Sequence, residues 1–508
     1  MTRPIRIGNC SGFYGDRIDA AREMVASGEV DVVCGDYLAE LTMLILAKAQ
    51  AKDPSAGYAK TFLTQVEQIL VPCVERGIRI VSNAGGLNPA GLAEAIREVA
   101  ARLGVDATVA HVEGDDLRGD LEQVRPAVSG KPVSANAYLG GWGIAEALAA
   151  GADVVVTGRV TDASVVVGPA AWWHGWGRED WDALAGAVVA GHVIECGPQA
   201  TGGNYPFLDE ITDRRYPGFP IAEVAADGSS VITKPEDTGG LVSVGTVTAQ
   251  LLYEIGAPAY LGPDVTSHFD TIRLAPGGEH RVSISGVRGS APPETLKVAL
   301  NDVGGYRNTM TLVLTGLDIE AKAAFAEQQL FDILGGRDRF ESVDVRLLRF
   351  DRPDAGSNDQ ATAHLRVTVK DPDPHKVGRA FSGGVMQQAL AGYAGFHTTT
   401  PPSSESLFGV YRPAAVPRSA VTQTVVLEDG TRATVADPPT GPVPSAPEPP
   451  SAGTVHGPTQ RLPLGTVCGA RSGDKGGDAN IGLWTRDDAA HAWLRGFLSA
   501  DKVRELLG

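Results

Sequence analysis

The stretch Arg79-Ile-Val-Ser-Asn-Ala-Gly-Gly-Leu-Asn-Pro89 joins a short apolar segment to a polar, glycine-rich loop. A short apolar run that ends at turn residues is typical of a buried strand, while Asn and Gly favour turns and helix starts. The order of strand, polar turn and helix recurs through the first part of the chain. It predicts an α/β domain on a mainly parallel sheet with helices on both faces.

Further strands are predicted at 5–7, 30–34, 106–111, 131–135 and 153–157, with helical spacing over stretches such as 17–27 and 37–51. A polar turn follows each of the six strands, at 9–11, 35–36, 83–88, 113–116, 136–141 and 158–162. Because ligands bind at the carboxyl ends of parallel strands, we expect a site at this edge. The alternative is that these residues only form turns and cap helices.

Three residues at this edge are candidates for catalysis. Asp36 and Glu40 lie one turn apart at a helix start. There they could do acid–base work, hold a divalent ion, or interact with the helix dipole. Cys10 lies in a glycine-rich loop near a helix start and is a candidate nucleophile. The alternative for Cys10 is the packing role of a small apolar residue.

The other candidates are predicted to bind substrate. Arg159 and Asp162 could orient a carboxylate or phosphate, or form an ion pair with each other. The remaining candidates are small or amide residues, some at sites of close backbone approach: Asn9, Ser11, Gly12, Asn83, Gly85, Gly86, Asn88, Asn136, Gly158, Gly202, Gly203 and Asn204. His192, Glu195 and Cys196 resemble a metal cluster, but a strand here would separate His192 from Glu195.

The chain divides into four predicted segments: an α/β ligand-binding domain at 1–240, an α+β domain at 241–437, a Pro-rich linker at 438–463 and a short module at 464–508. In the second segment, strands are expected at 281–286, 307–314, 342–349 and 363–370, with helices near 293–300, 318–334 and 375–391. In the last, two strands flank a loop at 469–480, and a helix follows. This loop carries Asp474, Lys475, Asp478 and Asn480, which could cradle an anion, bind a metal or cap a turn.

Composition excludes several classes of protein. The 508 residues include 44 Lys and Arg against 61 Asp and Glu, a net charge of −17. We expect no nucleic-acid binding, because phosphates require a positive face. Five dispersed cysteines without a CxxC pair predict neither a disulfide framework nor a zinc ribbon. No run reaches the roughly 18 apolar residues of a membrane span, so we expect no membrane insertion and a cytoplasmic location.

Several of these motifs together resemble the acyclic terpene utilisation (AtuA-type) family of bacteria. The stretches that carry the resemblance are 9–17, 35–40, 82–89, 157–162, 195–197 and 202–204. The resemblance covers about residues 4–430, and residues 471–482 are similar to the start of the family's ferredoxin-like domain. It implies a role in the catabolism of branched acyl-CoA intermediates. It also implies a partial ferredoxin-like module, which is either truncated or completed by another chain.

Two hypotheses of function follow. The first is a catabolic enzyme acting on a branched acyl-CoA or related carboxylic acid, as a lyase or hydratase. Asp36 or Glu40 would be its acid–base group and Arg159 would hold the anion, with Asn83, Asn88 and Asn204 orienting a carbonyl group. A divalent metal and a CoA moiety on the substrate are the candidate cofactors.

The second hypothesis is a non-catalytic binding or assembly subunit of a degradation-pathway complex. A partner subunit would then bind through the C-terminal module. Under either hypothesis we expect a homo-oligomer.

Overall fold

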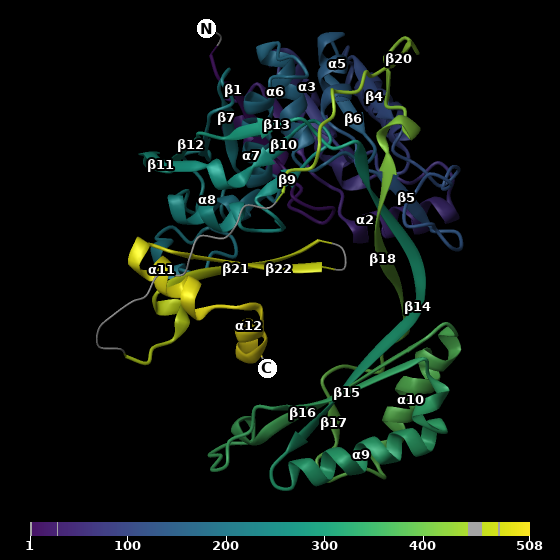
Figure 1. Cartoon of the computed structure of the whole chain (residues 1–508). Coiled ribbons are helices and arrows are strands. Elements are labelled where there is room, and N and C mark those ends of the chain that lie inside the picture. Colours follow the sequence, from purple (N-terminus) through teal and green to yellow (C-terminus); the bar gives the residue numbers. More distant parts are fainter. Residues whose placement is uncertain (1–2, 28, 446–459, 476–477, 508) are drawn as a thin grey trace. The chain divides into compact units, whose positions relative to one another are not determined.

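A computed structural model describes residues 3–27, 29–445, 460–475 and 478–507 (Figure 1). The chain forms two compact units, Met1–Asn301 with Tyr411–Gly508, and Asp302–Val410. Residues 241–301, which we expected in a second domain, belong to the first unit. The predicted Pro-rich linker falls largely on residues 446–459, which lie outside the described residues.

The first unit is built on a mixed sheet with a parallel centre. Its order within the described residues is β11-β12-β8-β7-β1-β2-β3-β6-β4-β19-β20. The parallel strands are β1 (Ile5–Asn9), β2 (Val32–Gly35), β3 (Arg79–Ser82), β6 (Val154–Thr157) and β4 (Val109–Glu113). The flanking antiparallel strands are β7 (Ile221–Val224), β8 (Ser230–Thr233), β11 (Arg273–Gly278), β12 (Arg281–Ser285), β19 (Thr424–Val426) and β20 (Arg432–Thr434). The predicted parallel sheet is therefore confirmed for the centre and wrong for the flanks.

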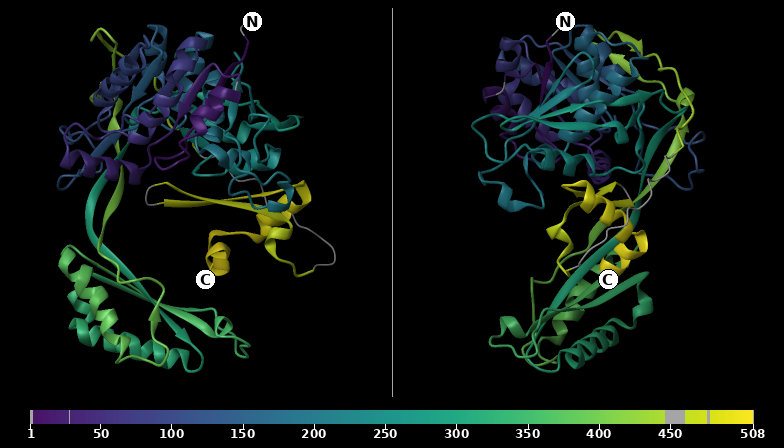
Figure 2. Two further views of the ribbon diagram at one scale, coloured as in Figure 1. Left: turned by 180° about the vertical axis from the view of Figure 1, so that it is seen from behind. Right: turned by 60° about the vertical axis from the view of Figure 1, so that its left-hand side comes forward.

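Helices cover both faces of the parallel centre, as predicted (Figure 2). One face packs against α5 (Trp142–Ala149), α6 (Ser164–His174) and α7 (Trp181–Ile194). The other packs against α1 (Ala20–Ser27), α2 (Glu40–Lys52), α3 (Lys60–Arg76) and α4 (Pro89–Leu103). Val32 lies in the first core and Val33 in the second, because successive side chains of a strand alternate between faces. A strand buried on both faces must be apolar throughout, which explains the short apolar runs.

Two predicted elements differ in the structure. The strand expected at 131–135 is β5 (Ser134–Ala137), which pairs antiparallel with β14 (Thr295–Thr315) instead of joining the large sheet. The helix expected near 293–300 is the first part of β14, because Leu296, Val298 and Leu300 face the core at the spacing of two that a strand requires. This unit also contains α8 (Val244–Leu251) and a small sheet of β9 (Ala259–Leu261), β10 (Thr266–His268) and β13 (Arg288–Ser290).

The second unit has a βαββαβ order. After β14 come α9 (Ile319–Leu334), β15 (Ser342–Arg349), β16 (Thr362–Asp371), α10 (Phe381–Met386), β17 (His397–Thr398) and β18 (Ser406–Pro417). The antiparallel order β15-β16-β14-β17 is that of a ferredoxin-like fold. Helices α9 and α10 contribute Leu330 and Phe381 to one core with Leu312 and Leu365 of the sheet. The expected α+β domain is thus a ferredoxin-like unit, a topology that we had predicted only for the C-terminus.

The C-terminal module is a β-hairpin followed by two helices (Figure 2). Strand β21 (Cys468–Lys475) pairs antiparallel with β22 (Asp478–Thr485), and α11 (Asp488–Phe497) and α12 (Ala500–Leu507) follow. The predicted succession of two strands and a helical segment is confirmed, but this segment is two helices, and the first strand begins at Cys468. The loop predicted at 469–480 is wrong, because most of it is paired strand. The glycines of this segment predicted a loop, but in the structure they allow close packing of the hairpin. A Cβ on Gly473 would lie 2.7 Å from the ring of Tyr253.

Candidate functional site

A buried polar network lies at the carboxyl ends of β1, β2 and β3. Asp36, directly after β2, accepts a hydrogen bond of 2.6 Å from Nδ2 of Asn83, which follows β3. The Oδ1 of Asn83 accepts one of 2.8 Å from the backbone N–H of Tyr37. Asn9 ends β1, and its Nδ2 donates to the backbone carbonyl of Glu195 at 3.2 Å. The edge of the sheet therefore gathers three predicted site residues, Asn9, Asp36 and Asn83, all of them buried.

Arg159 follows β6 and is only 2% exposed. One of its terminal nitrogens lies 2.8 Å from Oδ1 of Asp162 and donates to the backbone carbonyl of Leu38 at 2.6 Å. Its Cζ stands 4.1 Å from the ring centre of Tyr138, whose hydroxyl donates to Glu40 at 3.1 Å. The guanidinium thus contacts the Asp162 carboxylate, the Leu38 carbonyl and the Tyr138 ring, all of them groups of the protein itself. This geometry favours the internal ion pair, which was our alternative to binding a substrate anion.

The electrostatics of this network favour a protonated carboxyl group. Burial raises the pKa of Asp36 well above its ordinary value, and the Asp162 carboxylate raises it further. The Arg159 guanidinium and the hydrogen bond from Asn83 oppose this shift. Burial disfavours the charge of Arg159, but Asp162 leads the groups that raise its pKa overall, so it stays positive. A raised pKa makes a carboxyl group a stronger proton acceptor than an ordinary one, which suits acid–base work.

Asp115 is a second buried carboxylate, which sequence analysis placed in a turn but did not select. Its Oδ2 accepts hydrogen bonds from Nδ2 of Asn136 at 2.7 Å and from the backbone N–H of Arg159 at 2.8 Å. A Cβ on Gly158 would lie 2.2 Å from its Oδ1. Asn136 and Gly158 therefore fit around Asp115 and shape the turn before Arg159. Burial raises the pKa of Asp115 to about 7, against the effect of these hydrogen bonds.

This shift predicts that stability falls as the pH rises. Folded Asp115 keeps its proton to about pH 7, whereas the ordinary carboxyl value is 3.8. Its contribution is complete below the unfolded pKa and lost as the pH rises through the folded one, at roughly 2–3 kcal/mol between about pH 5 and pH 8. We expect Asp115→Asn to flatten the pH dependence of the free energy of unfolding by that amount in urea denaturation. The exposed Asp120→Asn is the control, and an unchanged slope in Asp115→Asn would contradict the assignment.

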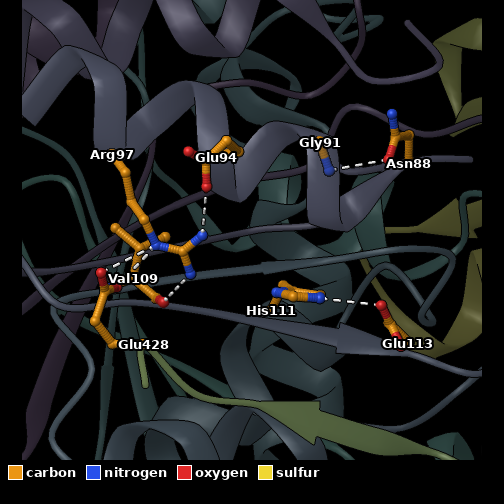
Figure 3. Close-up of polar contacts among 8 residues, drawn as sticks. All are labelled: Asn88, Gly91, Glu94, Arg97, Val109, His111, Glu113 and Glu428. Atoms are coloured by element: carbon orange, nitrogen blue, oxygen red, sulfur yellow. Dashed lines mark hydrogen bonds and ion pairs between the residues drawn. The ribbon is translucent and has the colours of Figure 1, made fainter. Parts of the chain in front are cut away.

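Asn88 caps a helix. Its Oδ1 accepts a hydrogen bond of 2.9 Å from the backbone N–H of Gly91 in the first turn of α4 (Figure 3). Its Nδ2 donates to backbone carbonyls of the loop after α2. Further along α4, Arg97 pairs with Glu428 between β19 and β20, which holds the helix to that hairpin (Figure 3). The contacts of the Asn88 side chain favour its capping role over the orientation of a substrate carbonyl.

The glycines predicted at the site let backbone segments approach one another. A Cβ on Gly12 would lie 2.7 Å from the backbone of Cys196, and one on Gly85 would lie 2.5 Å from the carbonyl oxygen of Thr157. Larger residues at these positions would force the backbone apart. The other predicted residues of these turns are Gly86, Gly202, Gly203 and Asn204; all but Gly203 have a left-handed backbone conformation.

Cys10 and Ser11 occupy the turn after β1. Burial raises the pKa of the Cys10 thiol well above its ordinary value. Because the thiolate is the nucleophilic form, this environment favours the packing role of Cys10. The backbone N–H of Ser11 donates to Oδ1 of Asn9 at 2.9 Å, which fixes the turn.

His192 and Glu195 lie together at the C-terminal end of α7. Nδ1 of His192 is 3.3 Å from Oε1 of Glu195, and both residues are buried. The expected strand, which would have separated them, is wrong because Trp181–Ile194 is helical and residues three apart share a helix face. The rings of Tyr260 and Phe269 flank His192.

A cavity of about 620 Å³ within the first unit reaches the network at Asp162. Tyr138, Glu254 and Lys297 also line it. Most of the other lining residues are apolar and include Ile255, Ala257, Leu261, Pro263, Leu296 and Ala414. Asp162 therefore belongs to both features, paired with Arg159 on the side of the network and exposed to the cavity on the other.

Lys297 and Glu254 line this cavity but were not among the predicted site residues. Nζ of Lys297 lies 4.7 Å from the ring centre of Tyr138 and 5.9 Å from that of Tyr411. Lys297 fell in the segment predicted as a helix, and the apolar alternation of Leu296 with Val298 was the signal that could have placed it on a strand. Glu254 is an isolated carboxylate in a turn and belongs to no recognisable motif.

Residues 5–427 match the family model described as acyclic terpene utilisation family protein AtuA. The chain belongs to this family. The match confirms the resemblance and contains the polar network together with Glu254 and Lys297. No curated protein matches the chain significantly.

The C-terminal hairpin lies beyond the residues matched to the acyclic terpene utilisation family. Asp474 is exposed on β21, whereas Asn480 on β22 contacts the turn after α8. The side chains of Lys475 and Asp478 lie outside the described residues. An anion or metal cradle at this position therefore stays a prediction.

Within the described part of this family member, no group of three or more His, Cys, Asp or Glu side chains is placed to hold a metal ion. A divalent metal therefore stays a prediction. None of the described helices has the length and apolar character needed to cross a bilayer.

Proposed function

We propose that the chain is a catabolic enzyme acting on a branched acyl-CoA or a related carboxylic acid, as a lyase or hydratase. The observation that carries this proposal is the network of Asp36, Arg159 and Asp162, which meets a cavity at Asp162. Lyases and hydratases move a proton next to a carbonyl group. They need an acid–base group and a donor or cation for the developing negative charge.

Asp36 and Asp162 are the proposed acid–base pair. Asp162 lines the cavity and meets the substrate, while Asp36 lies deeper and is oriented by Asn83. Two neighbouring carboxyl groups in a buried site tend to share one proton, because they resist carrying two negative charges. Arg159 pairs with Asp162, and its charge also favours the ionised form of Asp36.

The cavity suits a branched acyl chain with an anionic end. Its volume of about 620 Å³ lies within the range of about 300–1,000 Å³ common for small-molecule sites. The apolar wall would hold the branched chain. Lys297, between the rings of Tyr138 and Tyr411, would hold a carboxylate or a phosphate of the CoA moiety.

A panel of branched acyl-CoA thioesters and the corresponding free acids tests the proposal. Each would be incubated with the full chain, with and without Mg²⁺, and the products identified by mass spectrometry. Addition or loss of water, or cleavage into two products, supports the proposal. Failure to convert any member of the panel under either condition contradicts it.

Replacing Lys297 by Met is expected to raise KM about 10–100-fold and to change kcat little, because the lost contact is a charge-assisted hydrogen bond in the ground state and transition state alike. The variant keeps the length of the side chain and its packing against Tyr138. The matched control is Lys502→Met on α12, whose side chain pairs with Glu505. A fall in kcat at unchanged KM would reject this role for Lys297.

An assembly subunit is the second candidate, and one observation favours it. Leu506 and Leu507 on α12 are 53% and 71% exposed, which is unusual for adjacent large apolar side chains. Under this alternative, a partner subunit co-purifies with the full chain, and Leu507→Ser releases it. Activity of the isolated chain on the thioester panel would decide for the enzyme.

A further inference from the structure

The C-terminal hairpin is hydrogen-bonded to the turn that follows α8. Nδ2 of Asn480 donates to the backbone carbonyl of Leu252 at 2.8 Å, and its Oδ1 accepts from the backbone N–H of Glu254 at 3.0 Å. One amide side chain thus holds both ends of the turn. Gly473, the strand partner of Asn480, packs against Tyr253 so closely that a Cβ would lie 2.8 Å from the nitrogen of Glu254.

Two further contacts fix the hairpin at this place. The guanidinium of Arg471 lies over the ring of Tyr253, with Cζ 4.4 Å from the ring centre, and it also hydrogen-bonds Gln199. The ring of Trp484 packs edge-on against Phe207. The hairpin therefore holds the turn at Leu252, Tyr253 and Glu254.

Glu254 has a backbone conformation that a side-chain-bearing residue rarely adopts. Its φ is 54°, in the left-handed region. The hydrogen bond from its N–H to Asn480 offers one reason why it persists there. Such conformations are retained where the surrounding structure holds them, often at functional sites.

The same turn and the same hairpin form part of the cavity wall. Residues 254–257 line the cavity on one side of the turn, and Ala479 and Asn480 line it from the hairpin. Asp162 lines the same cavity. Glu254 is therefore a second acidic residue in the wall of the cavity, and its backbone is held by a segment outside the family match.

We propose that Glu254 is a catalytic carboxylate of the cavity and that Asn480 is the positioning residue that fixes it there. The inference rests on the proposed function and deepens it, since a lyase or hydratase uses one group to remove a proton and another to deliver one. Glu254 and Asp162 would take these two roles from different parts of the wall. The C-terminal module is then a part of the active site.

Hydrogen exchange tests the positioning role without relying on activity. In the full chain, Asn480→Ala should expose the Glu254 amide, whose hydrogen bond it removes, and speed its exchange at least about tenfold. Ser472→Ala, an exposed change on the same hairpin, should leave that amide unchanged. Equal exchange in wild type and Asn480→Ala would overturn the positioning role.

Activity on the thioester panel tests the catalytic role. Glu254→Gly suits the left-handed conformation and so should keep the fold, yet it removes the carboxylate. We expect it to lower kcat at least about 100-fold, and Asn480→Ala to lower kcat about 10-fold with little change in KM. Full activity of Glu254→Gly in an active protein overturns this inference alone. An inactive wild type overturns the proposed function and with it the role of Glu254.

Discussion

Replacing Asp36 by Asn is expected to lower kcat by about 10²–10⁴-fold on whichever thioester the wild type converts, because acid–base catalysis contributes on that order. Asn has the same shape as Asp, and its carbonyl oxygen can still accept the hydrogen bond from Asn83. The chain should therefore fold normally and bind substrate with a similar KM. What the variant loses is the carboxyl group that, in the proposed function, holds the proton to be transferred.

The pH profile separates this role from a structural one. The neighbouring Asp162 carboxylate raises the pKa of Asp36, and the influence is mutual for two like charges. Asn at position 36 does not titrate, so the limb of the kcat profile that belongs to Asp36 should disappear. Asp53→Asn, at the exposed end of α2, is the control and should leave rate and profile unchanged. A variant at position 36 with the wild-type rate would reject the acid–base pair.

The local pattern of the chain was enough to predict the centre of the first unit. Strands buried on both faces must be apolar throughout, and polar residues can begin only where the strand leaves the core. This rule located Asn9, Asp36, Asn83 and Arg159 and predicted their shared edge. The rule does not tell whether a polar residue at this edge binds a substrate or another group of the protein. Arg159 therefore suggested a substrate ligand, although its geometry favours an internal ion pair.

The antiparallel flanks and the cavity depend on contacts between distant segments. Nothing in the sequence of β5 shows that it pairs with β14, because the pairing partner of a strand is set by the whole fold. The cavity has the same origin: Asp162, Glu254, Lys297 and Asn480 come from four separate parts of the chain. Each is unremarkable in its own segment, and only their meeting in space makes them candidates.

The ferredoxin-like unit illustrates a further limit. Strands β14, β15 and β16 and helices α9 and α10 of this unit were expected, whereas β17 and β18 were not; the period-two burial of β16 is clear. The order β15-β16-β14-β17 was not, because many sheet orders are compatible with the same succession of elements. A fold name follows from strand order, which the pattern of single segments does not contain.

Replacing Arg159 by Met should lower the free energy of unfolding by about 3–5 kcal/mol at neutral pH, as expected when one partner of a buried ion pair is removed. Met fills much of the same space, so the effect comes from charge more than from a cavity. Without the guanidinium, the electrostatic repulsion between Asp36 and Asp162 is no longer offset, and the Leu38 carbonyl loses a donor. The site then gains a strong preference for protons.

Because of this preference, the loss of stability in Arg159→Met should depend on pH. In the variant the folded pKa of Asp36 rises further above the unfolded value, because the guanidinium that opposed this shift is gone, so the stabilising contribution of its proton is kept at low pH and lost as the pH rises. The destabilisation by Arg159→Met should therefore be smaller near about pH 5 than near about pH 8. Urea denaturation followed by tryptophan fluorescence reports the relevant unit, because all 7 tryptophans lie outside residues 302–410.

Two comparisons make the result decisive. Arg118→Met removes the exposed pair with Asp116 and should cost less than about 1 kcal/mol at either pH. Adding Asp162→Asn to Arg159→Met removes one of the uncompensated charges and should restore part of the lost stability, most of it at the higher pH. If Arg159→Met were no more destabilising than Arg118→Met, Arg159 would not be the cation that holds the acid–base pair together, and its role in the proposed mechanism would have to be given up.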